Sequence, residues 1–99
     1  GTTAGQRAIE LEPGAGLAHG NLGAVLRDQQ KWDDAIAAYR KALEMDKKDE
    51  VLWNNLGNAL YNLGKVAESI TCFDRAIELK GDFEEAWNNK GAALGAMKK

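Results

Sequence analysis

The 99-residue chain contains one cysteine, one histidine and one proline, so residue types on which many functions depend are nearly missing. A single cysteine, Cys72, cannot form an intrachain disulfide, and nothing therefore marks an oxidising compartment. One cysteine and one histidine cannot supply the four protein ligands of a usual zinc site. Cys72 also has no candidate base beside it in the sequence. We therefore predict no catalytic centre, no metal site and no cofactor.

The chain also lacks an excess of charge of one sign and any long apolar run. Its formal net charge is −2, with acidic and basic residues interleaved. This balance argues against a nucleic-acid partner, which requires a basic stripe, and against a polybasic membrane-surface segment. No run approaches the roughly 20 apolar residues of a membrane span, and the polar N-terminus does not resemble a signal peptide. The sequence predicts a cytoplasmic protein that contacts neither membrane nor nucleic acid.

What the chain has instead is an internal repeat. WNNLGNAL begins at Trp53, and WNNKGAAL begins 34 residues later at Trp87. The same spacing aligns three glycines, Gly23, Gly57 and Gly91, and three similar phrases, AIELEP, ALEMDK and AIELKG. A fixed period of this length is typical of repeat architectures. The predicted units of a single domain are the end of one repeat at 1–15, full repeats at 16–49 and 50–83, and the start of another at 84–99.

Within each unit apolar residues recur three and four apart, which predicts helices and no strands. Gly64 marks a helix end, because glycine adopts the left-handed conformation there at little cost. Gln30 occupies the equivalent position in the preceding unit, so either Gln30 is mildly strained or that turn adopts another form. The predicted helices cover 2–12, 17–29, 32–45, 50–63, 66–79 and 84–97.

A 34-residue helix–turn–helix unit resembles the tetratricopeptide repeat (TPR), whose signature begins W-x₂-L-G-x₂-Y and continues with A-x₃-F and a second alanine. The matches span essentially the whole chain. They are Ala8, Pro13, Leu22, Gly23, Ala35, Tyr39, Ala42, Trp53, Leu56, Gly57, Phe73, Ala76, Trp87 and Gly91. The departures include His19 for tryptophan, Leu26, Leu60 and Leu94 for tyrosine, Ser69 for alanine, Lys90 for leucine, and Lys47 and Gly81 for proline. The resemblance implies an all-α solenoid of antiparallel helix pairs wound into a right-handed superhelix.

The signature residues have a physical role in this fold. Glycine inside a helix costs about 1 kcal/mol relative to alanine, so Gly57 must permit a close helix approach. The rings of Tyr39 and Phe73 are expected to fill the space between helices. His19, in a tryptophan position, is expected to be a buried or half-buried packing residue, and Cys72 an ordinary thiol on a helix surface.

Asparagines gather on the opposite side of the first helix of each unit. Helical phase at about 100° per residue separates Trp53, Leu56 and Gly57 from Asn54, Asn55, Asn58 and Asn62. Asn21, Asn88 and Asn89 take this side in the neighbouring units, with Arg27 and Tyr61 at its edge. In the TPR resemblance the first helices line the concave groove, so these nine residues form the predicted peptide-binding site.

Two interpretations of this side remain open. It can be an ordinary solvated helix face, although asparagine is a poor helix former for that purpose. It can also hold a peptide, because each primary amide offers a donor and an acceptor to an extended backbone. Asn21, Asn55 and Asn89 resemble the asparagine ladder in the TPR superhelix of O-GlcNAc transferase. Gly20, Glu85 and Asn89 do not match the basic residues of the dicarboxylate clamp of TPR cochaperones, so an acidic C-terminal tail is disfavoured.

The leading prediction is a non-enzymatic protein–protein interaction module that binds an extended peptide or protein segment in its groove, as part of a longer TPR array. The alternative is a structural unit whose unpaired terminal helices stack head to tail into a homo-oligomer, forming open filaments or closed rings.

Overall fold

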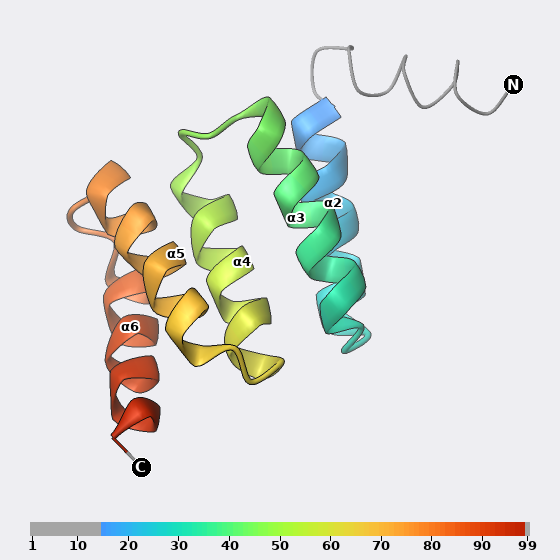
Figure 1. Ribbon diagram of the computed structural model, residues 1–99. Helices are drawn as coiled ribbons and strands as arrows, with labels where there is room; N and C mark the ends of the chain where they lie inside the picture. The colour runs from blue at the N-terminus through green and yellow to red at the C-terminus, as the bar shows by residue number, and fades with distance from the viewer. Residues whose placement is uncertain (1–14, 99) are drawn as a thin grey trace, which may run out of the picture.

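The computed structural model describes residues 15–98, and every regular element among them is a helix. The five helices follow one another across the molecule in chain order (Figure 1). They are α2 (Ala15–Asp28), α3 (Trp32–Met45), α4 (Glu50–Asn62), α5 (Val66–Leu79) and α6 (Glu84–Met97). Their ends lie within two residues of the predicted ones, which confirms the all-α prediction. The predicted helix 2–12 lies outside the described residues.

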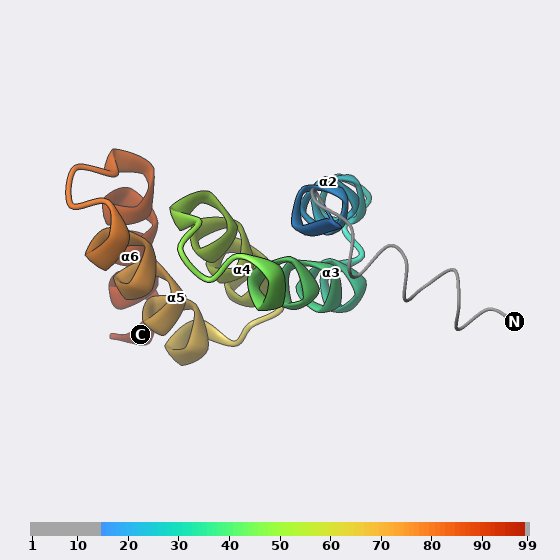
Figure 2. The same ribbon diagram turned by 90° about the horizontal axis from the view of Figure 1, so that it is seen from above.

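The helices form two antiparallel pairs and one further helix. Seen from above, α2 lies with α3 at one end and α5 lies with α6 at the other, with α4 between them (Figure 2). α4 packs on α5 as its own partner and on α3 of the preceding pair. A central helix such as α4 is therefore contacted on several sides, and this decides which of its polar residues remain accessible.

Two turns of the same design close the helix pairs. Gln30 has a φ of +62° and Gly64 a φ of +94°, so both adopt the left-handed conformation. In the first turn Lys31 N donates to Leu26 O at 2.9 Å, and in the second Lys65 N donates to Leu60 O at 2.8 Å. This is the pattern of a Schellman-type helix end. The expected strain at Gln30 is confirmed, because a side chain there is unfavourable by about 1 kcal/mol or more.

Two of the three glycines spaced 34 residues apart pack against aromatic rings. A Cβ atom on Gly23 would lie 2.7 Å from Tyr39 Cε1, and one on Gly57 would lie 2.6 Å from Phe73 Cε1. Both rings are buried, and so are Ala42 on α3 and Ala76 on α5, each three residues after a ring. The third glycine, Gly91, has no atom within 4 Å of a built Cβ. The predicted packing role of glycine is thus confirmed for the two complete helix pairs.

The two tryptophans of the repeat also anchor the turns that precede them. Trp53 Nε1 donates to Lys47 O at 2.8 Å, and Trp87 Nε1 donates to Gly81 O at 2.8 Å. The accepting carbonyls belong to the positions where the TPR signature has proline. Each tryptophan therefore ties its helix to the turn before it, a role that the helical pattern did not reveal.

Two departures from the TPR pattern are accommodated locally. Lys90 replaces a leucine, and its ammonium lies 2.7 Å from Asp74 Oδ1 of α5 and 5.6 Å from the centre of the Trp87 ring. His19 is half-buried as expected, and its Nε2 has no hydrogen-bond partner among the described residues.

The prediction that Cys72 lies on a helix surface is wrong. Its side chain is 6% exposed and belongs to the apolar core with Leu56 and Leu60 of α4. The error arises because α5 buries positions 69, 72, 73 and 76, a stripe wider than the aromatic and alanine positions alone. Burial raises the pKa of the thiol from its ordinary 9.0 to about 11, so Cys72 is a packing residue with little thiolate at neutral pH.

Candidate functional site

Apart from Asn88 on α6, five asparagines remain accessible along the first helices of the repeats. Asn21 on α2 and Asn62 on α4 are exposed, whereas Asn55 and Asn58 on α4 and Asn89 on α6 are half-buried. We call these five residues the amide face. Asn55, Asn58 and Asn62 are three and four residues apart, so they project from one side of α4. The accessible amides extend along α2, α4 and α6 rather than being confined to one helix.

Asn54 differs from the expectation that it lines the groove, because its side chain is only 1% exposed. Its Oδ1 accepts a hydrogen bond of 3.0 Å from Asn89 Nδ2, which joins α4 to α6. Helical phase places Asn54 beside Asn55, but α6 covers that edge of α4. Asn54 therefore cannot meet a ligand directly and instead holds a residue that can. Asn88, its equivalent on α6, is exposed.

Asn55 is held by a different group. Arg27 Nη1 donates to Asn55 Oδ1 at 3.4 Å, which joins α2 to α4. The Arg27 side chain is 29% exposed and also pairs with the neighbouring Asp28 at 3.5 Å. Arg27 was predicted at the edge of the site, and the structure adds that it bonds a central asparagine. Tyr61, the equivalent residue on α4, is half-buried.

Asn58 and Asn62 bond to each other rather than across helices. Asn62 Nδ2 donates to the backbone oxygen of Asn58 at 2.8 Å and to its Oδ1 at 3.1 Å. Both bonds join residues one turn apart near the C-terminal end of α4. These two asparagines thus support the helix end, and Asn55 and Asn89 are the amides fixed by neighbouring helices.

The surroundings of the amide face include exposed apolar residues at one end. Leu17 is 70% exposed and Val51 is 48% exposed, and Glu85 is the equivalent residue on α6. The clamp positions hold Gly20, Glu85 and Asn89, none of which carries a positive charge, and Arg27 supplies a positive charge beside Asn55.

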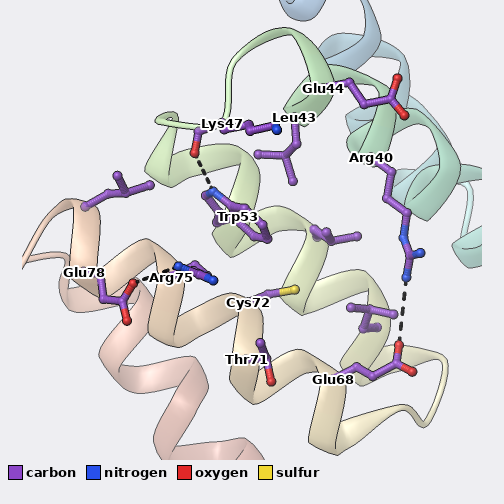
Figure 3. A pocket seen from close by; sticks show the side chains of 13 residues that line it. Arg40, Leu43, Glu44, Lys47, Trp53, Glu68, Thr71, Cys72, Arg75 and Glu78 are labelled. Carbon is purple, nitrogen blue, oxygen red and sulfur yellow. Dashed lines mark hydrogen bonds and ion pairs between the residues drawn. The ribbon is translucent and has the colours of Figure 1, made fainter.

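A pocket of about 800 Å³ lies elsewhere, between α3 and α5 over α4 (Figure 3). Trp53 lines it, and because Trp53 and Asn55 are two residues apart they project from opposite sides of α4. Leucines of all three helices line it, and the Arg40–Glu68 ion pair of 3.9 Å joins α3 to α5 beside them. The lining residues are Arg40, Leu43, Glu44, Lys47, Trp53, Leu56, Leu60, Glu68, Thr71, Cys72, Arg75, Glu78 and Leu79. Sequence analysis did not predict this pocket, because α3 and α5 belong to different repeat units.

The part of the chain from 15 to 98 holds no group of three or more His, Cys, Asp or Glu side chains arranged for a metal ion. Within the same residues no helix combines the length and apolarity needed to cross a bilayer.

The fold and the repeated contacts define a helical repeat protein, and comparison with known proteins names the repeat. The family model described as TPR repeat matches residues 23–64, and that described as tetratricopeptide repeat matches residues 51–83. The chain belongs to the tetratricopeptide repeat family. No curated protein sequence matches it significantly.

Solved TPR structures resemble the chain closely in fold. The first TPR domain of Spaghetti (RPAP3), bound to the HSP90 peptide SRMEEVD, is 29% identical with a TM-score of 0.81 over 83% of this chain and 65% of that one. The TPR2B domain of yeast Sti1, in complex with pHsp70, is 25% identical with a TM-score of 0.82 over 84% of this chain and 66% of that one. The second TPR domain of Spaghetti, bound to the same HSP90 peptide, is 22% identical with a TM-score of 0.82 over 84% and 77%. The chain thus spans slightly less than two thirds of the first two.

Proposed function

We propose that this chain is a non-enzymatic interaction module that binds an extended peptide or protein segment along the amide face. The observation that carries the proposal is that Asn55 and Asn89 are each held by a side chain of a neighbouring first helix. Amides fixed in this way have lost side-chain freedom before a ligand arrives, which lowers the entropic cost of binding. The similar TPR domains in complexes with HSP90 and Hsp70 ligands support a peptide as the ligand.

We further propose that the segment is internal and neutral rather than an acidic C-terminal tail. The HSP90 peptide SRMEEVD carries three acidic residues and a terminal carboxylate when it binds Spaghetti. Here Glu85 stands at one of the clamp positions and would repel such a ligand. The exposed Leu17 and Val51 offer contact to apolar side chains of the bound segment instead.

An array of random-sequence heptapeptides, probed with the labelled chain and followed by titration of the best binder, tests the proposal. The variant Asn21→Ala/Asn55→Ala/Asn89→Ala should lose most of the affinity while its helical circular dichroism is retained. Thr71→Arg is the matched control, because Thr71 is exposed in the pocket on the other side of the molecule. Unchanged affinity in the triple variant would remove the amide face from the proposal, and a loss only with Thr71→Arg would move the ligand to the pocket.

The second candidate function is self-assembly through the outer helices. On α6, Trp87, Leu94 and Met97 are 49%, 43% and 57% exposed, and on α2 Leu22 and Val25 are 50% and 52% exposed. Exposed apolar residues clustered on a helix favour association with another helix. Light scattering over a range of concentrations tests this candidate, with Leu94→Glu/Met97→Glu as the variant expected to prevent association. A chain that stays monomeric at every concentration would exclude it.

A further inference from the structure

The two fixed asparagines of the amide face are held by opposite ends of their amide groups. At Asn55 the bonded atom is the oxygen, because the partner is Arg27 and a guanidinium can only donate. The NH₂ group of Asn55 makes no bond within the described residues, so both of its N–H groups are available to a ligand. At Asn89 the bonded atom is Nδ2, which uses one of its two N–H groups to donate to Asn54 Oδ1 at 3.0 Å. The carbonyl oxygen of Asn89 accepts no bond from the described residues and is therefore the end that is fully available to a ligand.

The difference follows from residues that are equivalent in the repeat. Gly20 takes the place of Asn54 in the preceding unit and has no side chain to offer Asn55. A Cβ atom on Gly20 would lie 3.0 Å from Leu52 Cδ2, so Leu52 fills the space that a side chain would need. In the next unit the equivalent of Leu52 is Ala86, which is fully buried and short. Ala86 on α6 is smaller than Leu52, so it leaves room for the Asn54 side chain of α4, which is larger than Gly20.

The residues at positions 27 and 61, which are equivalent in the repeat, also differ between the two contacts. Arg27 reaches across from α2 to Asn55. Tyr61 stands at the equivalent position on α4, and within the described residues it makes no hydrogen bond to Asn89. A tyrosine hydroxyl can donate or accept, but Arg27 imposes one orientation on its partner. The two contacts between first helices are thus built from different residue sets with opposite polarity.

From this geometry we infer that Asn55 donates to a backbone carbonyl of the bound segment, whereas Asn89 accepts from a backbone N–H. This inference rests on the proposed function and assigns the role of each amide within it. Arg27 and Asn54 are positioning residues, since each acts on the ligand through the asparagine that it bonds. An extended peptide presents both N–H and C=O groups along its backbone, so the ligand class is a segment in β conformation without proline opposite Asn89.

Substitution of Asn55 or Asn89 by aspartate tests whether the two amides have different roles, as inferred here, or bond the ligand in the same way. Aspartate has nearly the shape of asparagine but only accepts hydrogen bonds when ionised. Asn55→Asp keeps its bond to Arg27 and loses the donor, so affinity for the best array heptapeptide should fall about tenfold. Asn89→Asp keeps an acceptor toward the ligand, and the Asn54 amide can turn to donate to it, so affinity should change by less than about threefold.

Peptide chemistry gives an independent measurement. Each backbone N–H of the heptapeptide is replaced in turn by an ester oxygen, which removes one donor. The ester at the N–H that Asn89 binds should weaken binding to the wild-type chain and to Asn55→Ala, but cause no added loss with Asn89→Ala. In the free protein, exchange of the Asn89 side-chain amide protons should accelerate in Asn54→Ala and that of Asn55 should not.

The outcomes are distinct. Equal losses in Asn55→Asp and Asn89→Asp, or a larger loss in the latter, overturn the inference while the amide face stays the binding site. Failure of every array peptide to bind the wild-type chain overturns the proposed function itself.

Discussion

The contact between α2 and α4 and the contact between α4 and α6 are built at equivalent positions of one repeat, yet from different side chains. In the first, Arg27 bonds Asn55 and Leu52 packs beside Gly20. In the second, Asn54 bonds Asn89, and Ala86 and Tyr61 take the sequence positions equivalent to Leu52 and Arg27. The packing of glycine on an aromatic ring is common to both helix pairs. The comparison teaches that the repeat fixes the position of the asparagine, whereas its less regular neighbours fix which end of the amide is available.

The largest expected effect is at Leu52, which fills the space beside Gly20. Leu52→Ala should lower the free energy of unfolding by about 2–4 kcal/mol, because it leaves a cavity in a buried contact. Adding Gly20→Asn should recover part of the loss, since it reproduces the Asn54–Ala86 pairing at the first contact. Urea unfolding of the wild type and both variants measures this. Additive behaviour of the two substitutions would show that the volumes at this contact are not matched.

Gly57 provides a test of what the repeats share. Gly57→Ala should lower stability by about 1–2 kcal/mol, because its Cβ would lie 2.6 Å from the buried Phe73 ring and this outweighs the gain in helix propensity. Gly91→Ala is the matched control, with no atom within 4 Å of the new Cβ. It should leave thermal unfolding unchanged or raise its midpoint. A similar loss in both variants would contradict the ring-packing explanation.

The two second helices differ at Cys72, whose equivalent on α3 is Ala38. Burial raises the thiol pKa from 9.0 to about 11, so the folded chain keeps a proton that the unfolded chain loses in this range. The associated stability is therefore present below pH 9 and is lost as the pH rises from 9 to 11. The slope should reach at most about 1.4 kcal/mol per pH unit.

Cys72→Ala, which copies α3, should remove this part of the pH dependence in urea titrations between these limits. The pKa of Tyr39 is also raised by burial, but Tyr39 is present in both proteins and its effect cancels in their difference. Parallel pH profiles of the two proteins would show that the thiol does not titrate on unfolding.

The features that could be predicted from the sequence are those that depend on a single helix and its partner within one repeat. Helix ends, the left-handed Gln30 and the glycine packing all follow from periodicity and turn chemistry. The burial of Asn54 and the bonds of Asn55 and Asn89 were not predicted, because a helical wheel assigns faces without knowing which neighbour covers them. α4 is covered by α6 along one edge and approached by Arg27 along another, and both contacts join residues 28 or more apart. The tryptophan bonds to Lys47 O and Gly81 O were missed because they involve backbone atoms.

The smallest expected effect is at the turns, where the two units differ by one residue. Gln30→Gly should raise the free energy of unfolding by about 1 kcal/mol, because it relieves a side chain from the left-handed conformation at φ +62°. Gly64→Gln is the reverse change at φ +94° and should lower stability by a similar amount. Urea unfolding of the two variants measures the expected gain at Gln30 and the expected loss at Gly64 against the same wild-type chain. Since neither turn is hydrogen-bonded to the amide face within residues 15–98, peptide affinity should be the same in both variants. A change in affinity would mean that the turn geometry controls how α2 presents Arg27 to Asn55, and the two contacts would then differ in backbone as well as in side chains.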